Sequence, residues 1–306
     1  MFGAWRPQAV TAEPFSGHSP PFFIQKMKKI ILFTLALWPL MLSAQSGWTR
    51  AQKAWFLKID ASQLRAERYY NPNGDELTTN TFTQTSFNLY GEYGFRPRLT
   101  FIVQAPLLRL NRFETTHSTA GFGDLRLEAK YRFTGNRLPV SVSIAPELPT
   151  GRANAYAVNR EFPSDRINLP TGDGEFNVWG TLAASKSFGK LYASTFTAYN
   201  FRTKYEGKKF RNLYQFGAEI GFHPWKPLWL NAKLRAQFSE GRSRHPDLGF
   251  VRGDGTTYTL ASMEALYKIN KKWGISAAYL SGGDWIAPFR NIYIAPYFSV
   301  GAVYEQ

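Results

Sequence analysis

Few side chains in this sequence could carry out chemistry. Beyond residue 44 there are three histidines, His117, His223 and His245, and the whole chain has no cysteine. A Ser–His hydrolase built on a strand needs both side chains on one face, two residues apart. His117 is instead followed directly by Ser118, and the other two histidines each precede a proline, as turn residues commonly do. The histidine pattern therefore predicts that the chain is not an enzyme.

Paired carboxylates are the second possible source of chemistry. Asp124 and Glu128 share one face of a predicted strand, but Arg126, Lys130 and Arg132 alternate with them there. Such a ladder of opposite charges neutralises itself, which indicates a structural network rather than an acid–base pair. The missing cysteines exclude a disulfide scaffold and a zinc–thiolate site. Metal-ligand spacings and phosphate-binding loops are also absent from the sequence, and we predict no cofactor and no metal.

The segment that carries this ladder has the alternation of a strand with one apolar face. Leucine, alanine and aromatic residues occupy every second position from Leu125 to Phe133, and charged residues occupy the positions between them. A helix would scatter these charges around its axis, whereas a strand separates the two sets. Twelve segments have comparable patterns: 54–70, 81–94, 99–113, 123–133, 139–149, 175–187, 191–203, 212–222, 228–239, 256–268, 273–283 and 292–304.

The connections between these segments alternate between short and long. Five are short turns, and the others are longer and polar: 71–80, 114–122, 150–174, 204–211, 240–255 and 284–291. Aromatic residues lie beside the short turns, at Phe95, Phe133, Phe188, Trp225 and Trp273. Segregated loop lengths, an even strand number and such aromatics are typical of an outer-membrane barrel, and a soluble sandwich has no reason to show all three. We predict an all-β, transmembrane, antiparallel up-and-down β-barrel of about twelve strands.

In such a barrel the apolar face meets lipid and the polar face meets the lumen. A charged side chain that faces lipid at mid-bilayer costs roughly 2–4 kcal/mol, so the charged positions of the strands are assigned to the inside. Lys58 and Asp60 belong to this set. We also predict a lumen charge ladder that consists of Asp124, Arg126, Glu128, Lys130, Arg132, Glu219, Lys233, Arg235 and Glu264.

The N-terminal residues have the features of an export signal. A basic start at residues 27–29 precedes an apolar stretch, and Leu42-Ser43-Ala44 offers a small-residue cleavage site. We therefore predict a signal peptide at 27–44, an over-called or disordered extension at 1–26, and the barrel at 45–306. A single membrane anchor is the alternative, but the stretch is short for a spanning helix. Export places the barrel in the outer membrane of a Gram-negative cell, with both termini periplasmic and with outer-membrane lipids as partners.

Three short motifs carry a resemblance to a known family. They are Gly121-Phe122-Gly123-Asp124 with the strand that follows, Ala145-Pro146-Glu147-Leu148-Pro149-Thr150-Gly151, and Leu169-Pro170-Thr171-Gly172-Asp173-Gly174. Together they resemble the meta-pathway phenol-degradation family of bacterial outer-membrane β-barrels. The chain departs from that pattern at Arg152, where an acidic residue is more typical, and in ending after Tyr304 with Glu305 and Gln306. The resemblance implies a barrel that passes small apolar or aromatic compounds.

The repeated Leu-Pro-Thr-Gly flanks the longest predicted loop, 150–174. Proline and glycine at these positions are explained by strand ends at the two rims of one loop. The alternative is that this loop folds back as a lid or plug. Barrels of about eight strands are filled by side chains and those of sixteen or more hold an aqueous channel, so twelve strands leave the state of the lumen open.

Three functions follow, in order of preference. The first is a passive channel or transporter for small solutes, and the second is a non-conducting structural barrel that acts as a subunit of an envelope assembly with other proteins. The third, a lipid-modifying enzyme, should lose activity in His117→Ala. Conductance in a planar bilayer distinguishes the first from the second.

The positive charge is concentrated at one end of the predicted barrel. The chain carries a formal net charge of +15, and residues 1–44 contribute four basic residues and one acidic residue, which leaves +12. The short turns hold seven basic residues and no acidic one: Arg96, Arg98, Arg137, Lys190, Lys226, Lys271 and Lys272. This distribution favours contact with anionic groups at the periplasmic end over a nucleic-acid partner. The alternative is that lysine and arginine are simply suited to solvated turns.

Overall fold

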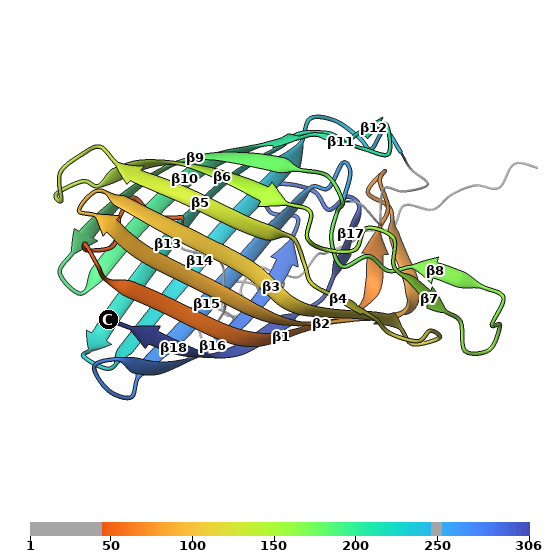
Figure 1. The fold of residues 1–306 in the computed structure, drawn as a ribbon, viewed down its shortest axis with the longest axis horizontal. Coiled ribbons are helices and arrows are strands. Elements are labelled where there is room, and N and C mark those ends of the chain that lie inside the picture. The colour runs from red at the N-terminus through yellow and green to blue at the C-terminus, as the bar shows by residue number, and fades with distance from the viewer. Residues whose placement is uncertain (1–44, 246–252) are drawn as a thin grey trace, which may run out of the picture. The chain divides into compact units, whose positions relative to one another are not determined.

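The computed structural model describes residues 45–245 and 253–306, and these residues form strands, turns and loops (Figure 1). The predicted signal peptide at 27–44 and the extension at 1–26 lie outside the described residues. Within the described ranges, no helix is long and apolar enough to cross a membrane.

Twelve long strands form one closed antiparallel barrel, and this confirms the predicted fold class. The strands are β1 (Trp55–Tyr70), β2 (Glu76–Arg96), β3 (Leu99–Phe113), β5 (Leu125–Arg132), β6 (Val140–Leu148), β9 (Asn177–Phe188), β10 (Leu191–Arg202), β13 (Leu213–Trp225), β14 (Leu228–Ser239), β15 (Tyr258–Lys268), β16 (Trp273–Gly283) and β18 (Tyr297–Glu305). Short strands lie in or beside the connections: β4 (Thr119–Gly121), β7 (Tyr156–Val158), β8 (Arg166–Asn168), β11 (Lys204–Tyr205), β12 (Lys208–Lys209) and β17 (Ile292–Ile294).

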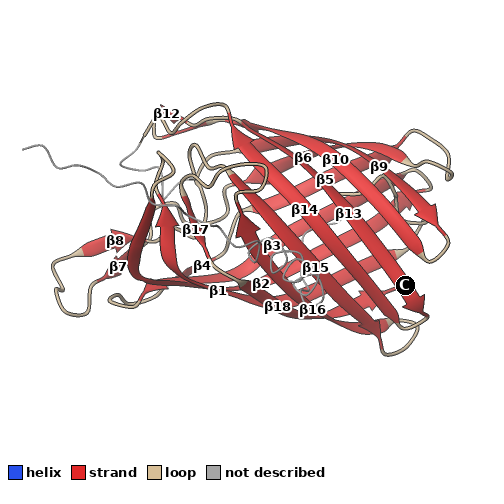
Figure 2. Ribbon diagram, turned by 180° about the vertical axis from the view of Figure 1, so that it is seen from behind, coloured by secondary structure: helices blue, strands red, loops and turns tan. Residues whose placement is uncertain are grey.

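Each long strand pairs with its sequence neighbours, and the first and last strands close the sheet. β1 pairs with β2 on one side, where Asp60 lies opposite Asn88, and with β18 on the other, where Asp60 lies opposite Gly301. The strands are tilted across the wall, which can be followed from both sides (Figures 1 and 2). Closure leaves no unpaired sheet edge, which is why a barrel can meet lipid.

The two ends of the barrel differ in their connections. At one end, here called the short-turn end, β2–β3, β5–β6, β9–β10, β13–β14 and β15–β16 are joined by two to seven residues, and the C-terminus lies there (Figure 1). The other end, the long-loop end, carries the longer connections. One of these is the β7–β8 hairpin, which projects beyond the barrel strands (Figure 1).

Burial is inverted relative to a water-soluble protein. Large apolar side chains are exposed along the outside, for example Ile59 at 56% and Val300 at 63%, whereas polar residues such as Thr100, at 1%, are buried inside. The five aromatics beside the short turns, Phe95, Phe133, Phe188, Trp225 and Trp273, are 46% to 58% exposed. An apolar outer band bordered by aromatic rings is suited to a lipid bilayer.

Several strands depart from the predicted boundaries, and the predicted strand 292–304 is divided into β17 and β18 at Ala295 and Pro296. β2 begins at Glu76, within the predicted loop 71–80. Its first residues are polar, but they still pair with β1, where Glu76 lies opposite Tyr70. The predicted strand 123–133 begins only at Leu125, and β4 is separate from it. The cause is Pro106, which lies at a register shift of β3 and whose carbonyl oxygen accepts from the Gly123 amide at 2.8 Å. A Cβ at Gly123 would lie 2.6 Å from the proline ring, so glycine is required there.

Candidate functional site

The barrel lumen is the candidate functional site, and ion pairs inside it join neighbouring strands and also strands that are not adjacent in the sheet. Lys58 on β1 binds Glu264 on β15, and Lys233 Nζ on β14 lies 3.5 Å from Glu219 Oε2 on β13. Tyr192 on β10 donates its hydroxyl hydrogen bond to Glu219. Paired in this way, these buried charges satisfy one another across the wall.

The residues of the predicted ladder on β5 do not form one cluster. Glu128 and Lys130 are buried inside, and Arg126 lies near Glu128, with 4.0 Å between Nη2 and Oε2. Arg132 lies at the short-turn end, where its Nη2 donates to the Pro97 carbonyl oxygen at 3.3 Å. Asp124 is outside the strand and binds loop backbone, as described below.

Residues 45–50 run inside the barrel from its short-turn end. The Gly47 amide donates to Ser185 Oγ at 2.8 Å, and Ser141 Oγ donates to the Ser46 carbonyl oxygen at 3.2 Å. Trp48 packs edge-on against Tyr192, with 5.4 Å between the ring centroids. This segment therefore fills part of the lumen.

Arg50 fixes the segment to the barrel wall. Its Nε donates to Glu92 Oε2 at 2.6 Å on β2, and its Nη1 donates to Glu305 Oε1 at 2.8 Å on β18. Lys268 also binds Glu305. The network joins the two strands on either side of β1 to the segment that precedes it.

Three of the cavities formed by the described residues of the lumen share lining residues. A cavity of about 410 Å³ lies toward the short-turn end between Lys58, Tyr90 and Trp229. A second, of about 360 Å³, contains Arg126, Trp179 and Arg235 and shares Gln104 with the first. A third, also about 360 Å³, lies at the long-loop end and shares Asp173 and Gly253 with the second. The lumen is thus a row of chambers separated by side chains.

The repeated Leu-Pro-Thr-Gly closes the base of loop 150–174. Asp124 accepts hydrogen bonds from the Gly151 amide (2.9 Å) and the Asp173 amide (2.7 Å), so that one carboxylate holds both ends of the loop. A Cβ on Gly151 would lie 2.6 Å from the Gly172 Cα, which explains glycine at these two positions. Burial, together with the negative charge of Asp173, raises the pKa of Asp124.

The returning part of this loop narrows the long-loop end. Asn111 Nδ2 donates to the Pro170 carbonyl oxygen at 2.6 Å, and Arg109 Nη1 donates to the Thr171 carbonyl oxygen at 2.9 Å. Pro170, Asn111 and Arg109 all line the third cavity. The β7–β8 hairpin itself projects outward (Figure 1), so within this loop it is the segment after β8 that lies at the lumen.

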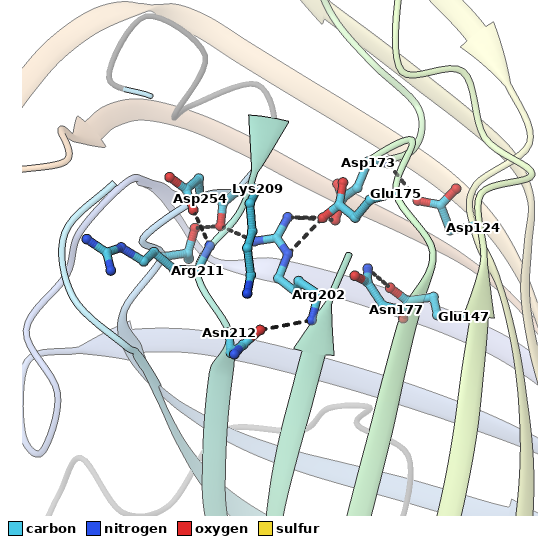
Figure 3. Close-up of polar contacts among 12 residues, drawn as sticks. Asp124, Glu147, Asp173, Glu175, Asn177, Arg202, Lys209, Arg211, Asn212 and Asp254 are labelled. Carbon is cyan, nitrogen blue, oxygen red and sulfur yellow. Dashed lines mark hydrogen bonds and ion pairs between the residues drawn. The ribbon is translucent and has the colours of Figure 1, made fainter. Parts of the chain in front are cut away.

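A buried ion pair anchors this segment to β10 (Figure 3). Arg202, at 2% exposure, donates from Nε to Glu175 Oε1 at 2.7 Å, and its Nη2 binds the same oxygen. Its Nη1 donates to the Gly253 carbonyl oxygen at 3.0 Å, and Asp173 Oδ2 lies 3.9 Å from its Nη2. Burial and the charge of Asp173 raise the pKa of Glu175 to about 7, although the Arg202 guanidinium opposes this.

The seven basic residues of the predicted turns are all exposed at the short-turn end of the barrel. They do not take part in the lumen networks described above. The three histidines lie apart from one another: the His117 amide donates to the Val158 carbonyl oxygen, His223 stacks on Trp229 at 4.1 Å, and His245 packs edge-on against Phe210. The described residues contain no group of His, Asp and Glu side chains suited to a metal ion.

Sequence reasoning missed several of these residues. Glu92 lies on the polar face of a predicted strand, and that position could have assigned it to the lumen. Arg202 ends a segment whose alternation is weak, and residues 45–50 have no alternation at all, so no sequence pattern places them inside. Their partners are remote in the sequence.

The geometry defines the class of protein as a closed twelve-stranded barrel with a polar, partly filled lumen. An outer membrane channel from Pseudomonas putida F1 aligns with 87% of this chain and 100% of its own, with a TM-score of 0.62 and 14% identity. The NanC porin aligns over 82% and 100%, with a TM-score of 0.51 and 8% identity. The translocator domain of the autotransporter NalP from Neisseria meningitidis covers 92% and 94%, with a TM-score of 0.50 and 11% identity.

At these identities the likeness shows a shared fold and no more. No protein-family model matches the chain, and no curated protein matches its sequence. The resemblance to the meta-pathway phenol-degradation family therefore stays a prediction.

Proposed function

We propose that this protein is a passive channel for small solutes in the bacterial outer membrane. The observation that carries the proposal is the row of three cavities of about 360 to 410 Å³ inside a wall of inward-facing polar side chains. Two solved structures with this fold, an outer membrane channel and a porin, support it. Cavities of this size suit small organic molecules.

Apolar or aromatic solutes are the proposed class, and the third cavity supports it. Its wall holds Leu64, Phe82, Leu280 and Tyr293, and the rings of Phe82 and Tyr293 lie 5.0 Å apart. An apolar chamber at the long-loop end would take up a solute that prefers to leave water. The resemblance found in the sequence points to the same class.

Single-channel recording of the refolded protein tests the proposal. Two shortened variants are compared with the full chain: one lacks residues 152–168 and the other lacks residues 45–49. We expect small conductance steps from the full chain and larger ones without residues 45–49, because that segment fills the lumen. Silence from all three proteins, each shown to be folded, would reject a channel.

The second candidate is a non-conducting barrel that serves as a subunit of an envelope assembly. The observation that favours it is the filling of the lumen by residues 45–50 and by the network of Arg50, Glu92 and Glu305. It predicts silence in the recordings together with co-purification of a partner protein.

The seven basic turn residues are proposed to contact anionic groups at the periplasmic face, such as lipid headgroups or peptidoglycan. Replacement of all seven by glutamine should weaken binding to anionic vesicles or shift ion selectivity. The matched control replaces Lys204, Lys208 and Lys209, which lie at the opposite end. If the two variants have equal vesicle binding and equal ion selectivity, the seven residues are explained by their suitability for solvated turns.

A further inference from the structure

The second lumen cavity, here called the arginine cavity, contains two cationic side chains that are not fully paired. Arg126 enters it from β5 and Arg235 from β14. Three further lining residues are charged, Glu147, Asp173 and Arg202, and seven carry neutral amide or hydroxyl groups: Gln45, Gln104, Asn200, Gln215, Gln237, Thr256 and Tyr258.

Arg126 is held in place by an aromatic ring. Its guanidinium carbon lies 5.0 Å from the centroid of Trp179, which orients the plane of the group. Nε and Nη2 are buried and have no hydrogen-bond partner in residues 45–245 and 253–306, since Glu128 approaches only to 4.0 Å.

Arg235 is held in a comparable way on the other side of the cavity. Its guanidinium carbon lies 5.7 Å from the centroid of Phe196, two strands away. Gly217 lies between the two strands in register, and a Cβ there would come within 2.6 Å of the Phe196 ring. Arg235 Nε is buried and lacks a hydrogen-bond partner in the described part of the chain.

Arg126 and Arg235 line the same cavity, where Glu147 lies opposite Arg126 in the register of β5 and β6, whereas Arg235 has no carboxylate within ion-pair distance among the described residues. Like charges brought together in a site of low polarity are unfavourable unless an anion lies between them. Carboxylates suit this position because a guanidinium donates to both of their oxygens.

Two other lining side chains indicate which polar groups a bound carboxylate should also carry. Asn200 Oδ1 is a buried acceptor and Trp179 Nε1 a buried donor, and neither has a partner among the described residues. A hydroxyl group can serve both, because it donates and accepts. A purely apolar solute would leave these groups unsatisfied.

We propose that the arginine cavity binds a small hydroxylated carboxylate, with its carboxylate between Arg126 and Arg235 and its hydroxyl groups on Asn200 and the neighbouring amides. The inference rests on the proposed channel function and adds a second class of solute, bound at the arginine cavity, to the apolar class proposed from the third cavity.

Equilibrium binding to the refolded full chain tests this site without requiring conductance. The probes are gluconate, glucose as its neutral counterpart, and benzoate as a carboxylate without hydroxyl groups. We expect gluconate to bind at least tenfold more tightly than glucose and more tightly than benzoate. Arg126→Gln and Arg235→Gln should each weaken gluconate binding about 10- to 100-fold, as the loss of a charged hydrogen bond does. They should leave glucose binding unchanged.

The control variant is Arg112→Gln, since Arg112 is exposed near the long-loop end of β3 and should leave gluconate binding unchanged. Arg126→Lys keeps the charge and should retain part of the affinity, which separates recognition from a folding defect. Equal binding of glucose, tighter binding of benzoate, or gluconate affinity unaffected by both glutamine variants would overturn the proposal. Gluconate binding by a barrel that is silent in recordings would refute the channel function alone.

Discussion

Arg202 gives the sharpest test of how the long-loop end is narrowed. In Arg202→Gln the buried carboxylate of Glu175 loses its cation, and residues 169–175 lose their anchor on β10. Glu175 has a raised pKa of about 7 in the folded protein, against an ordinary value of 4.5, so the folded state binds this proton more tightly than the unfolded state. Its contribution to stability is therefore largest below pH 4.5 and decreases as the pH rises to about 7.

Removal of the guanidinium raises this pKa further, so the decrease continues above pH 7 in the variant. Each pH unit corresponds to about 1.4 kcal/mol, so the substitution should cost more at pH 9 than at pH 7, by at most about 3 kcal/mol over these two units. Below pH 6 the difference between the two proteins should be small and constant, because Glu175 is protonated in both folded states.

Urea unfolding of the barrel in detergent micelles, at pH 6, 7.5 and 9, measures this difference. The double variant Arg202→Gln/Glu175→Gln should lose the extra dependence on pH, and Arg112→Gln serves as the matched control on the outer surface. A difference in unfolding free energy that is the same at pH 6 and pH 9 would refute the assignment of the pH effect to Glu175.

Three further substitutions test other parts of the barrel. Gly221→Ala should cost about 1–3 kcal/mol in urea unfolding, because its Cβ would lie 1.8 Å from the Tyr192 ring, whereas Gly180→Ala, with open space, should cost almost nothing; equal costs would contradict this. Lys58→Met should cost about 3–5 kcal/mol by leaving Glu264 unpaired, and added Glu264→Gln should restore most of it. Asp124→Asn leaves one loop amide without its acceptor and should speed tryptic cleavage within loop 150–174 about tenfold; an unchanged cleavage rate would show that Asp124 does not hold the loop.

The strands were predictable because a barrel wall has one apolar face and one polar face. Alternation at Leu125 to Phe133 depends only on which side meets lipid, and it needs no knowledge of the neighbouring strands. Short turns such as residues 189–190 were predictable for a similar reason, since two adjacent antiparallel strands can be joined locally.

The lumen networks were less accessible to sequence reasoning. Lys58 and Glu264 both lie on polar faces, but their pairing depends on the closure of β1 against β18 and on the side chains that cross the lumen. The register shift at Pro106 and the place of Asp124 in the loop base likewise depend on contacts between remote segments.

The sequence by itself determined the barrel class, because that class follows from local alternation and from the lengths of the connections. Tertiary structure alone decided that residues 45–50 enter the lumen, that Arg202 anchors the returning loop, and that Arg126 and Arg235 face one cavity. The physical reason is that these contacts join residues far apart in the chain, and only closure of the sheet brings them within hydrogen-bond distance.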